Sequence, residues 1–531
     1  MGTGTKRKEV TALKRIVALL IALIFTTCTV LTAPVSYADK HDKTKFKGKS
    51  SDKKNARVVD GKDTSWFDYK NPKNEYEIMN EAQLIGLCSL VNEEQIDAWK
   101  PTRVESFEGV TFVLTRDIEL TEAWTPIGRD DSTNFAGTFD GNGHTISNVN
   151  ITTSFGHSGF FGYLTGEVKN LTLIGANKSN DSNCGGIVGT LSATGKVTNC
   201  ISGINVTGND KTGGIVGNNE SGTVEGCVNL GNINGTYKVG GVVGENWGGT
   251  IKQSGNKGKV KSTNRGFGTY GTGGVAGRSV SATAVVEECY NNGEINSNTE
   301  ATGGVVGYVN AAGSTVTDCY NTGTINIKTN DSNKNITDAY VGGVIGIAGV
   351  NGVKIRNCYN AGMTNGADIS GGVIGEYLNE TELKIEEKYI KNNYYVSMSF
   401  ESGIGQIEDD DDKNIDKAAK GISAGSIHNL TSSLSVAFMK DTGVYGNNGY
   451  PVLRWQQPVN IVEKEYFKGM PEDVQEDLDE YLVETAGEIR YGYTMLKVFL
   501  PQSTTTNAFI LYNEAKDKIE ELKKEDTKKD E

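Results

Sequence analysis

Short runs of alternating apolar and polar residues fill most of the chain from about residue 110 onward. The segments "VTFVLTRDIEL" (110–120) and "FAGTFDGNGHTISNVNI" (135–151) show this period of two and are cut by Asp-Gly and Gly-Asn turns. The pattern is typical of strands. Upstream, Asn80 and Gln83 resemble a helix capping box, and Leu84, Leu87 and Val91 then share one helical face. The chain is therefore predicted to form one short helix followed by many short strands.

The strand pattern itself repeats. The sequence "GGIVG" occurs at 185 and 213, "GGVVG" at 240 and 303, "GGVAG" at 273 and "GGVIG" at 342 and 371, with "SGFFG" at 158 as a degenerate forerunner. Most intervals are 27 to 33 residues, and the interval before 342 is longer. A second block, V-x-x-C-x-N-x-G-x-I, follows at a near-constant offset, as in "VEECYNNGEI" at 286. Units this small cannot bury their own apolar face, so they must stack.

We therefore predict an all-β fold, a parallel β-helix (β-solenoid) of about eight coils, with an N-terminal capping helix and a small C-terminal helical segment. Equivalent residues of successive coils should lie about 4.8 Å apart. Two aliphatic columns follow from this register, namely Val224, Ile251, Val286, Val316 and Ile355, and Ile233, Val260, Ile295 and Ile325. The paired glycines should mark a corner, where a Cβ would clash or where φ is positive.

Two other positions of the second block also fall in register. A turn ladder with left-handed backbone and amides that pair between coils is expected from Asn229, Asn256, Asn291, Asn321 and Asn360. An exposed face that binds a protein or glycan is expected to present Tyr290, Tyr320 and Tyr359. Val224 and Cys227 are three residues apart, so a bend or a bulge between them is required if both point inward, and the sequence does not decide which.

The cysteines form a further column, Cys200, Cys227, Cys289, Cys319 and Cys358, in which Ser254 replaces one member. They are interpreted either as buried thiols that act as small apolar residues or as disulfides between coils, such as Cys289 with Cys319. The buried-thiol interpretation is favoured because Ser254 interrupts the column and because stacked positions lack the tilted Cβ vectors that a disulfide needs.

The ends of the chain differ in composition from the repeats. Residues 1–38 have a basic start, an apolar stretch over 16–31 and small residues at Ser36 and Ala38, which predicts a signal peptide cleaved after Ala38; an uncleaved anchor helix is the alternative. The expected order is then a basic flexible linker (39–75), an N-terminal cap with the first strands (76–157), the repeats (158–400), an acidic loop with a closing segment (401–457) and a helical segment (458–531). The mature chain should be secreted or held at the cell surface, without a membrane span.

Candidate chemistry is sparse. The net charge of -13 argues against a nucleic-acid partner. The four histidines, His41, His144, His157 and His428, share no ligand spacing, there is no C-x-x-C pair, and the acidic run at 408–416 lacks the alternation and glycine of a calcium loop. No catalytic residue, metal site or cofactor is therefore predicted.

The repeat blocks resemble GLUG-motif repeats, Gly-rich units of exported bacterial surface proteins that include stalk regions of some immunoglobulin A metalloproteases. The resemblance covers roughly residues 76–456, including "WTPIG" at 124 and "NNGYPVLRWQ" at 447. It implies a stacked architecture, and the His-Glu-x-x-His helix of the proteases is absent from this sequence. We expect a non-enzymatic surface protein that is an adhesin-like binding or structural module. The alternative is a glycan-active enzyme, which needs carboxylates that converge across adjacent coils.

Overall fold

The structure is a computed structural model that describes residues 58–59, 61–68, 70–92, 106–152, 155–263, 270–327, 339–367, 369–378, 386–407, 415–441 and 447–456. All of these residues belong to one compact unit, which spans Asn55–Gln457. The predicted signal peptide (1–38), most of the predicted linker and the predicted C-terminal helical segment (458–531) lie outside the described residues.

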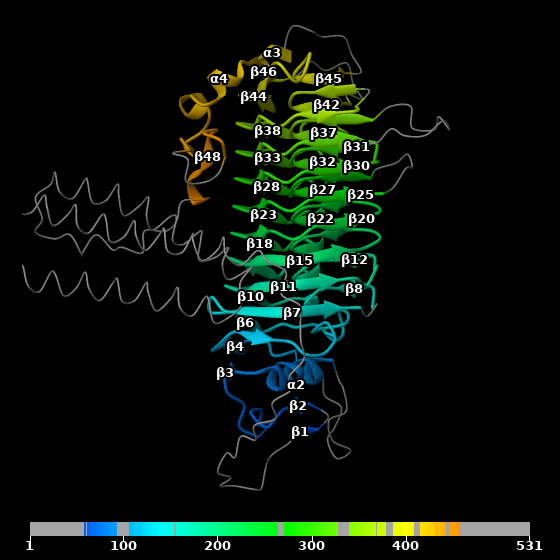
Figure 1. The fold of residues 1–531 in the computed structure, drawn as a ribbon, viewed down its shortest axis with the longest axis vertical. Helices are drawn as coiled ribbons and strands as arrows, with labels where there is room; N and C mark the ends of the chain where they lie inside the picture. The colour runs from blue at the N-terminus through cyan, green and yellow to red at the C-terminus, as the bar shows by residue number, and fades with distance from the viewer. Residues whose placement is uncertain are drawn as a thin grey trace, which may run out of the picture. The chain divides into compact units, whose positions relative to one another are not determined.

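Successive repeats pair side by side as parallel strands, so the predicted all-β solenoid is confirmed, with about ten turns rather than about eight (Figure 1). Val224 pairs with Ile251, and Ile251 pairs with Val286, as the first aliphatic column requires. In the second column, Ile233 pairs with Val260. These side chains are fully or almost fully buried. Burial of an aliphatic side chain contributes about 1.5–3 kcal/mol, so the stacked columns form the core.

Four sheets run along the stack, and the central coils contribute to all four. The first sheet contains β3 (Glu75–Ile78), β4 (Thr111–Leu114), β6 (Thr138–Asp140), β10 (Glu167–Lys169), β14 (Lys196–Thr198), β18 (Thr223–Glu225), β23 (Thr250–Lys252), β28 (Val285–Glu287), β33 (Thr315–Thr317), β38 (Lys354–Arg356) and β43 (Ile390–Lys391). The third sheet contains β8 (His157–Ser158), β12 (Asn183–Cys184), β16 (Thr212–Gly213), β21 (Val239–Gly240), β26 (Gly271–Gly273), β31 (Ala301–Gly303), β36 (Tyr340–Gly342) and β41 (Ile369–Gly371). The fourth sheet contains β9 (Phe161–Leu164), β13 (Val188–Leu191), β17 (Val216–Asn219), β22 (Val243–Trp247), β27 (Ala276–Val280), β32 (Val306–Val309), β37 (Ile345–Ala348), β42 (Ile374–Tyr377) and β45 (Ile404–Ile407).

The second sheet changes along the stack from one long strand per coil to two short ones. Its long strands are β7 (Thr145–Ile151), β11 (Thr172–Asn177) and β15 (Ile201–Thr207), and the short strand β5 (Ile118–Glu119) pairs with β7. One row of short strands contains β19 (Val228–Asn229), β24 (Gly255–Asn256), β29 (Tyr290–Asn291), β34 (Tyr320–Asn321), β39 (Tyr359–Asn360), β44 (Asn393–Val396) and β46 (Ala419–Ile422). The other row contains β20 (Ile233–Gly235), β25 (Val260–Ser262), β30 (Ile295–Ser297), β35 (Ile325–Ile327) and β40 (Thr364–Asn365).

The N-terminal end carries the predicted helix, α2 (Glu81–Val91). Asn80 caps it by accepting a hydrogen bond from the Gln83 backbone N–H at 3.0 Å, which satisfies one of the unpaired donors of the first turn. Before it stands an antiparallel pair, β1 (Val58–Val59) and β2 (Lys62–Asp63). The Trp66 ring lies 5.1 Å from that of Tyr76. The folded body thus includes residues from 58 onward that the sequence had placed in a flexible linker, because these aromatic rings pack on the first coil.

The paired glycines mark corners because a side chain has no room there. A Cβ on Gly241 would lie 2.1 Å from the Gly274 carbonyl oxygen and 2.4 Å from Cγ of Asn256. The φ angle of Gly241 is not positive, so space and not backbone conformation requires glycine. The required bend between Val224 and Cys227 lies at Gly226, whose φ is 66°. Gln253, Glu288, Asp318 and Asn357 hold the same left-handed position in later coils, with φ between 46° and 55°.

After the last coils the chain forms α3 (Ile415–Ala418), α4 (Ala424–Ile427), η2 (Leu430–Ser432), β47 (Phe438–Met439), β48 (Val452–Leu453) and η3 (Arg454–Gln456). The described part of 424–456 is called the closing segment below. It lies along the side of the stack beside β33 and β38 (Figure 1).

Candidate functional site

The tyrosine column is buried and does not form the exposed binding face that the sequence predicted. The side chains of Tyr290, Tyr320 and Tyr359 are 2%, 0% and 0% exposed. Their rings stack from coil to coil, with centroids 5.5 Å apart for Tyr290 and Tyr320 and 5.1 Å apart for Tyr320 and Tyr359. The closing segment covers them and adds Phe438 and Leu453 to the same apolar cluster.

Buried hydroxyl groups attach the closing segment to this column. The Tyr359 hydroxyl donates to the Pro451 carbonyl and accepts from Nδ2 of Asn447 at 3.0 Å. The Tyr320 hydroxyl bonds to the side-chain amide of Gln456 at 3.1–3.2 Å. Burial raises the pKa of both phenols well above its ordinary value, so both keep the proton that these bonds use. The column is therefore an internal docking surface.

Replacing Tyr359 by Phe should loosen the closing segment and leave the coils intact. The loss of a buried hydrogen bond costs about 1–2 kcal/mol, which raises the open population of the segment about tenfold. Limited proteolysis should then cut within 424–456 about tenfold faster, while the unfolding midpoint of the coils stays unchanged. The control is Tyr237→Phe, since the Tyr237 ring packs on Tyr270. Equal cleavage rates in both variants would contradict this role.

The asparagine ladder is buried, and its amides pair between coils. Nδ2 of Asn291 donates to Oδ1 of Asn321 at 2.8 Å, and Nδ2 of Asn321 donates to Oδ1 of Asn360 at 2.9 Å. Each amide also bonds the glycine two residues ahead, as Asn321 does with the carbonyl (3.0 Å) and N–H (3.1 Å) of Gly323. The expected left-handed backbone is wrong for all members, because their φ angles are not positive. The left-handed residue is the one before the cysteine.

The cysteine column consists of free, buried thiols. Each Sγ donates to the carbonyl two residues earlier, at 3.3 Å in Cys227 and 3.1 Å in Cys319. The hydroxyl of Ser254 makes the same bond at 2.8 Å, which explains why serine can replace cysteine there. Burial raises the pKa of Cys319 well above its ordinary value.

These thiols should be unreactive in the folded protein, because burial keeps a reagent from reaching the sulfur atoms. Of the 8 cysteines, Cys28 falls within residues 1–38, and the other seven are buried and free. A thiol reagent at pH 8 should label none of them in native residues 39–531 and all seven in denaturant. A lower number in denaturant without reductant would reveal disulfides and contradict the free column.

The outer side of β13, β17, β22, β27 and β32, called the Trp247 face below, was not predicted. Asn246 is fully buried, whereas Trp247 is 56% exposed. Glu245 lies two residues before Trp247, so both project outward from β22. The alternation in "GENW" at 244–247 is the sequence signal that could have located this face.

Ion pairs hold the centre of the Trp247 face. Glu245 bonds Nζ of Lys211 at 3.2 Å and Nη1 of Arg278 at 3.1 Å, and only 3% of its side chain is exposed. The Arg278 guanidinium also lies 5.8 Å from the centre of the Tyr308 ring. Removal of one partner would leave an uncompensated charge in a nearly inaccessible position, which is costly.

A second network extends the Trp247 face toward the N-terminal coils. Glu220 accepts from the Tyr163 hydroxyl at 3.1 Å and from Nδ2 of Asn218 at 2.9 Å. Burial, with Glu220 close by, raises the pKa of Tyr163 to about 12. Oδ1 of Asn218 is buried without a hydrogen-bond partner. Nearby, Nδ1 of His157 lies 2.7 Å from Oγ1 of Thr190, and burial lowers the pKa of this histidine.

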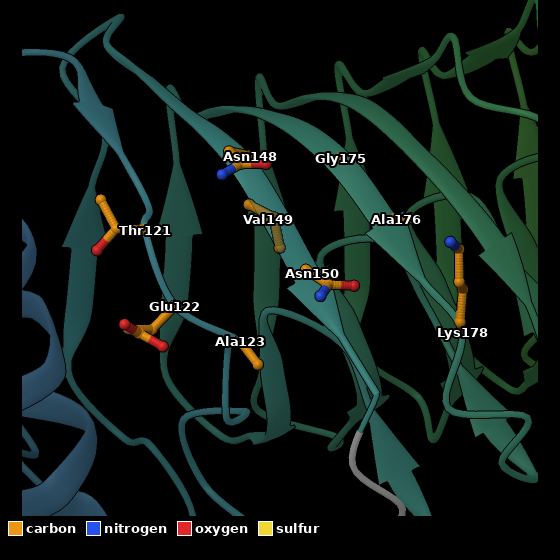
Figure 2. Close-up of a pocket in the computed structure, with 9 residues that line it drawn as sticks. All are labelled: Thr121, Glu122, Ala123, Asn148, Val149, Asn150, Gly175, Ala176 and Lys178. Carbon is orange, nitrogen blue, oxygen red and sulfur yellow. The ribbon is translucent and has the colours of Figure 1, made fainter. Parts of the chain in front are cut away.

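A separate hollow of about 400 Å³ lies over β7 and β11, where the strand register shifts between Leu173 and Gly175. Figure 2 shows Glu122 and Lys178 on opposite sides of it. The full lining is Thr121, Glu122, Ala123, Asn148, Val149, Asn150, Gly175, Ala176 and Lys178. It contains no aromatic ring on which a ligand could stack.

The described part of the chain lacks two features that would indicate other chemistry. Over the described ranges, no three His, Cys, Asp or Glu side chains gather closely enough to hold a metal ion. None of the helices in the described part of the chain has the length and apolarity that a membrane crossing requires.

Comparisons with known proteins assign no family to the chain. No protein-family profile matches it. Halomucin from Haloquadratum walsbyi (strain DSM 16790 / HBSQ001) is 33% identical over 147 residues, which make up 25% of this chain and 2% of Halomucin. A solved structure from Bacteroides ovatus, provisionally named an immunoglobulin A1 protease, aligns with a TM-score of 0.37 and 18% identity, over 75% of this chain and 94% of that one. The GLUG resemblance thus depends on the repeat residues alone.

Proposed function

We propose that the chain is an exported β-solenoid that works without catalysis, as an adhesin-like binding or structural module outside the cell. The observation that carries this proposal is the continuous in-register pairing of the first sheet along the stack. Strand pairs follow one another from β3 to β43 in the first sheet, and buried amide and thiol columns run inside it. Such an array places outward side chains at fixed spacing, which suits a scaffold that presents a binding surface.

Export is supported by the signal-peptide pattern of residues 1–38. In a bacterial host the full chain should appear outside the cytoplasm, shortened by residues 1–38. Deletion of the apolar stretch 16–31 should keep it in the cytoplasm. Recovery of both forms from the same compartment would contradict the proposed export.

The contacts of the carboxylates on the Trp247 face favour ligand binding over sugar hydrolysis. A glycosidase needs one carboxyl group to act as an acid and another to act as a base or nucleophile. On the Trp247 face, Glu245 is held in two ion pairs and each Glu220 oxygen accepts one hydrogen bond, so neighbouring donors fix both carboxylates in place. Purified residues 39–531 should therefore retain ligands on a glycan and protein array without releasing products. Release of shortened sugars would favour the glycan-active alternative.

A further inference from the structure

We infer that the Trp247 face is a binding site for neutral oligosaccharides. This inference rests on the proposed binding function and names its place and its ligand class. Three features of this face support it, namely an exposed ring, fixed polar groups near that ring, and their balance of charge.

Trp247 supplies a stacking platform. Of the large apolar side chains that are exposed in the described ranges, it is the one that lies on a strand of the fourth sheet. Trp247 pairs with Val280 of the next coil, and the Ser221 hydroxyl donates to the Trp247 carbonyl at 3.0 Å, so its backbone is held on both sides. An indole ring binds well to flat, partly apolar surfaces, and the C–H face of a pyranose is such a surface.

Polar groups suited to sugar hydroxyls flank this ring. Because Asn219 pairs with Asn246, Glu220 lies next to Trp247 on the preceding coil, and Arg278 pairs with Glu245 on the following one. Glu220 is exposed, and 16% of the Arg278 side chain is accessible. Carboxylate oxygens accept hydrogen bonds and guanidinium groups donate them, so together they match adjacent hydroxyl groups. Glu245 is nearly inaccessible and serves as a positioning residue for Lys211 and Arg278.

The local charges favour a neutral sugar. The cations Lys211 and Arg278 are both paired with Glu245, and Glu220 adds a second negative charge at the ring. An acidic sugar would be repelled by Glu220 and would have to compete with Glu245 for the two cations. Lysine and glutamate are depleted in the cores of protein interfaces, so Lys211, Glu220 and Glu245 weigh against a protein partner.

The test measures binding of neutral pentaoses of glucose, mannose and galactose, with oligogalacturonate as the acidic probe, to residues 39–531. Calorimetry gives the Kd, and tryptophan fluorescence reports on the ring. At least one neutral probe should bind, Trp247→Ala should raise its Kd about tenfold or more, and Trp247→Phe should raise it a few-fold. Val436→Ala, which removes another exposed apolar side chain (87% exposed), should leave the Kd unchanged. Unfolding midpoints of all variants should match, because both positions are exposed.

The possible results distinguish failure of the proposed binding site from failure of the proposed function. Equal Kd values for the wild type and Trp247→Ala would overturn the site while leaving a binding protein. Tighter binding of oligogalacturonate would overturn the neutral class. Failure of the wild type to bind any of the probes would overturn this inference, whereas the proposed function would fail only if the array also captured nothing or if sugars were cleaved.

Discussion

Replacing Gly304 by alanine should lower the free energy of unfolding by about 3 kcal/mol or more. A Cβ at this position would lie 2.1 Å from the Gly343 carbonyl oxygen and 2.5 Å from Cγ of Asn321. Neither neighbour can move away cheaply. The Gly304 N–H bonds the Gly342 carbonyl at 3.0 Å, and Asn321 is held in the buried ladder. The coils must separate locally, which breaks bonds on both sides of the substitution.

The measurement is the guanidinium midpoint together with hydrogen exchange of β31, β32, β36 and β37. The midpoint should fall, and exchange in these strands should accelerate. Gly425→Ala is the matched control, because a Cβ there meets nothing within 4 Å. It should leave the midpoint unchanged or raise it slightly, because alanine favours the helix α4 more than glycine does. Equal midpoints for the two variants would contradict the account of the corner.

Replacing Asn321 by aspartate should destabilise the protein in a pH-dependent way. The ladder needs a donor at Nδ2 of Asn321, which bonds Oδ1 of Asn360 and the Gly323 carbonyl. An ionised carboxylate offers acceptors only, whereas a protonated carboxyl retains one O–H donor. Burial and the facing oxygens therefore raise the folded pKa of the introduced group above its unfolded value of about 3.9. The added instability is smallest below about pH 4 and grows as the pH rises to the folded pKa, since only the unfolded state then releases the proton freely.

The test compares the unfolding midpoint of Asn321→Asp with that of the wild type, at pH 3.5 and again at pH 7. The loss at pH 7 should be several kcal/mol, because an unpaired buried charge is costly. Asn365→Asp is the control. In the wild type, Nδ2 of Asn365 donates to Oδ1 of Asn326 on the adjacent coil at 2.9 Å. This bond is exposed, so water can replace the lost donor. A loss that does not depend on pH would contradict the donor requirement.

The sequence predicted those parts of the fold in which equivalent residues stand at a constant spacing along the chain. The two aliphatic columns and the pairing of the amides follow from residues that recur at the same place in each repeat. The capped helix follows from the spacing of Asn80 and Gln83 and of the apolar residues after them. The position of the bend did not follow, because Gly226, Gln253, Glu288, Asp318 and Asn357 share a backbone conformation and not a residue type. The Trp247 face was missed for a related reason, since Glu245, Arg278 and Tyr308 occupy one column with different side chains.

The sequence alone determined that like residues of successive repeats stack, because a short unit with one apolar face is stable only against its neighbours. Only the tertiary structure decided which outward residues stay accessible. Tyr359 meets Pro451 and Asn447 across some ninety residues of chain, and Trp455 donates to the Glu288 carbonyl at 2.8 Å across a still longer interval. No repeat period relates these partners. The same register that places a tyrosine on the surface of a coil therefore leaves it buried once the closing segment packs against the stack.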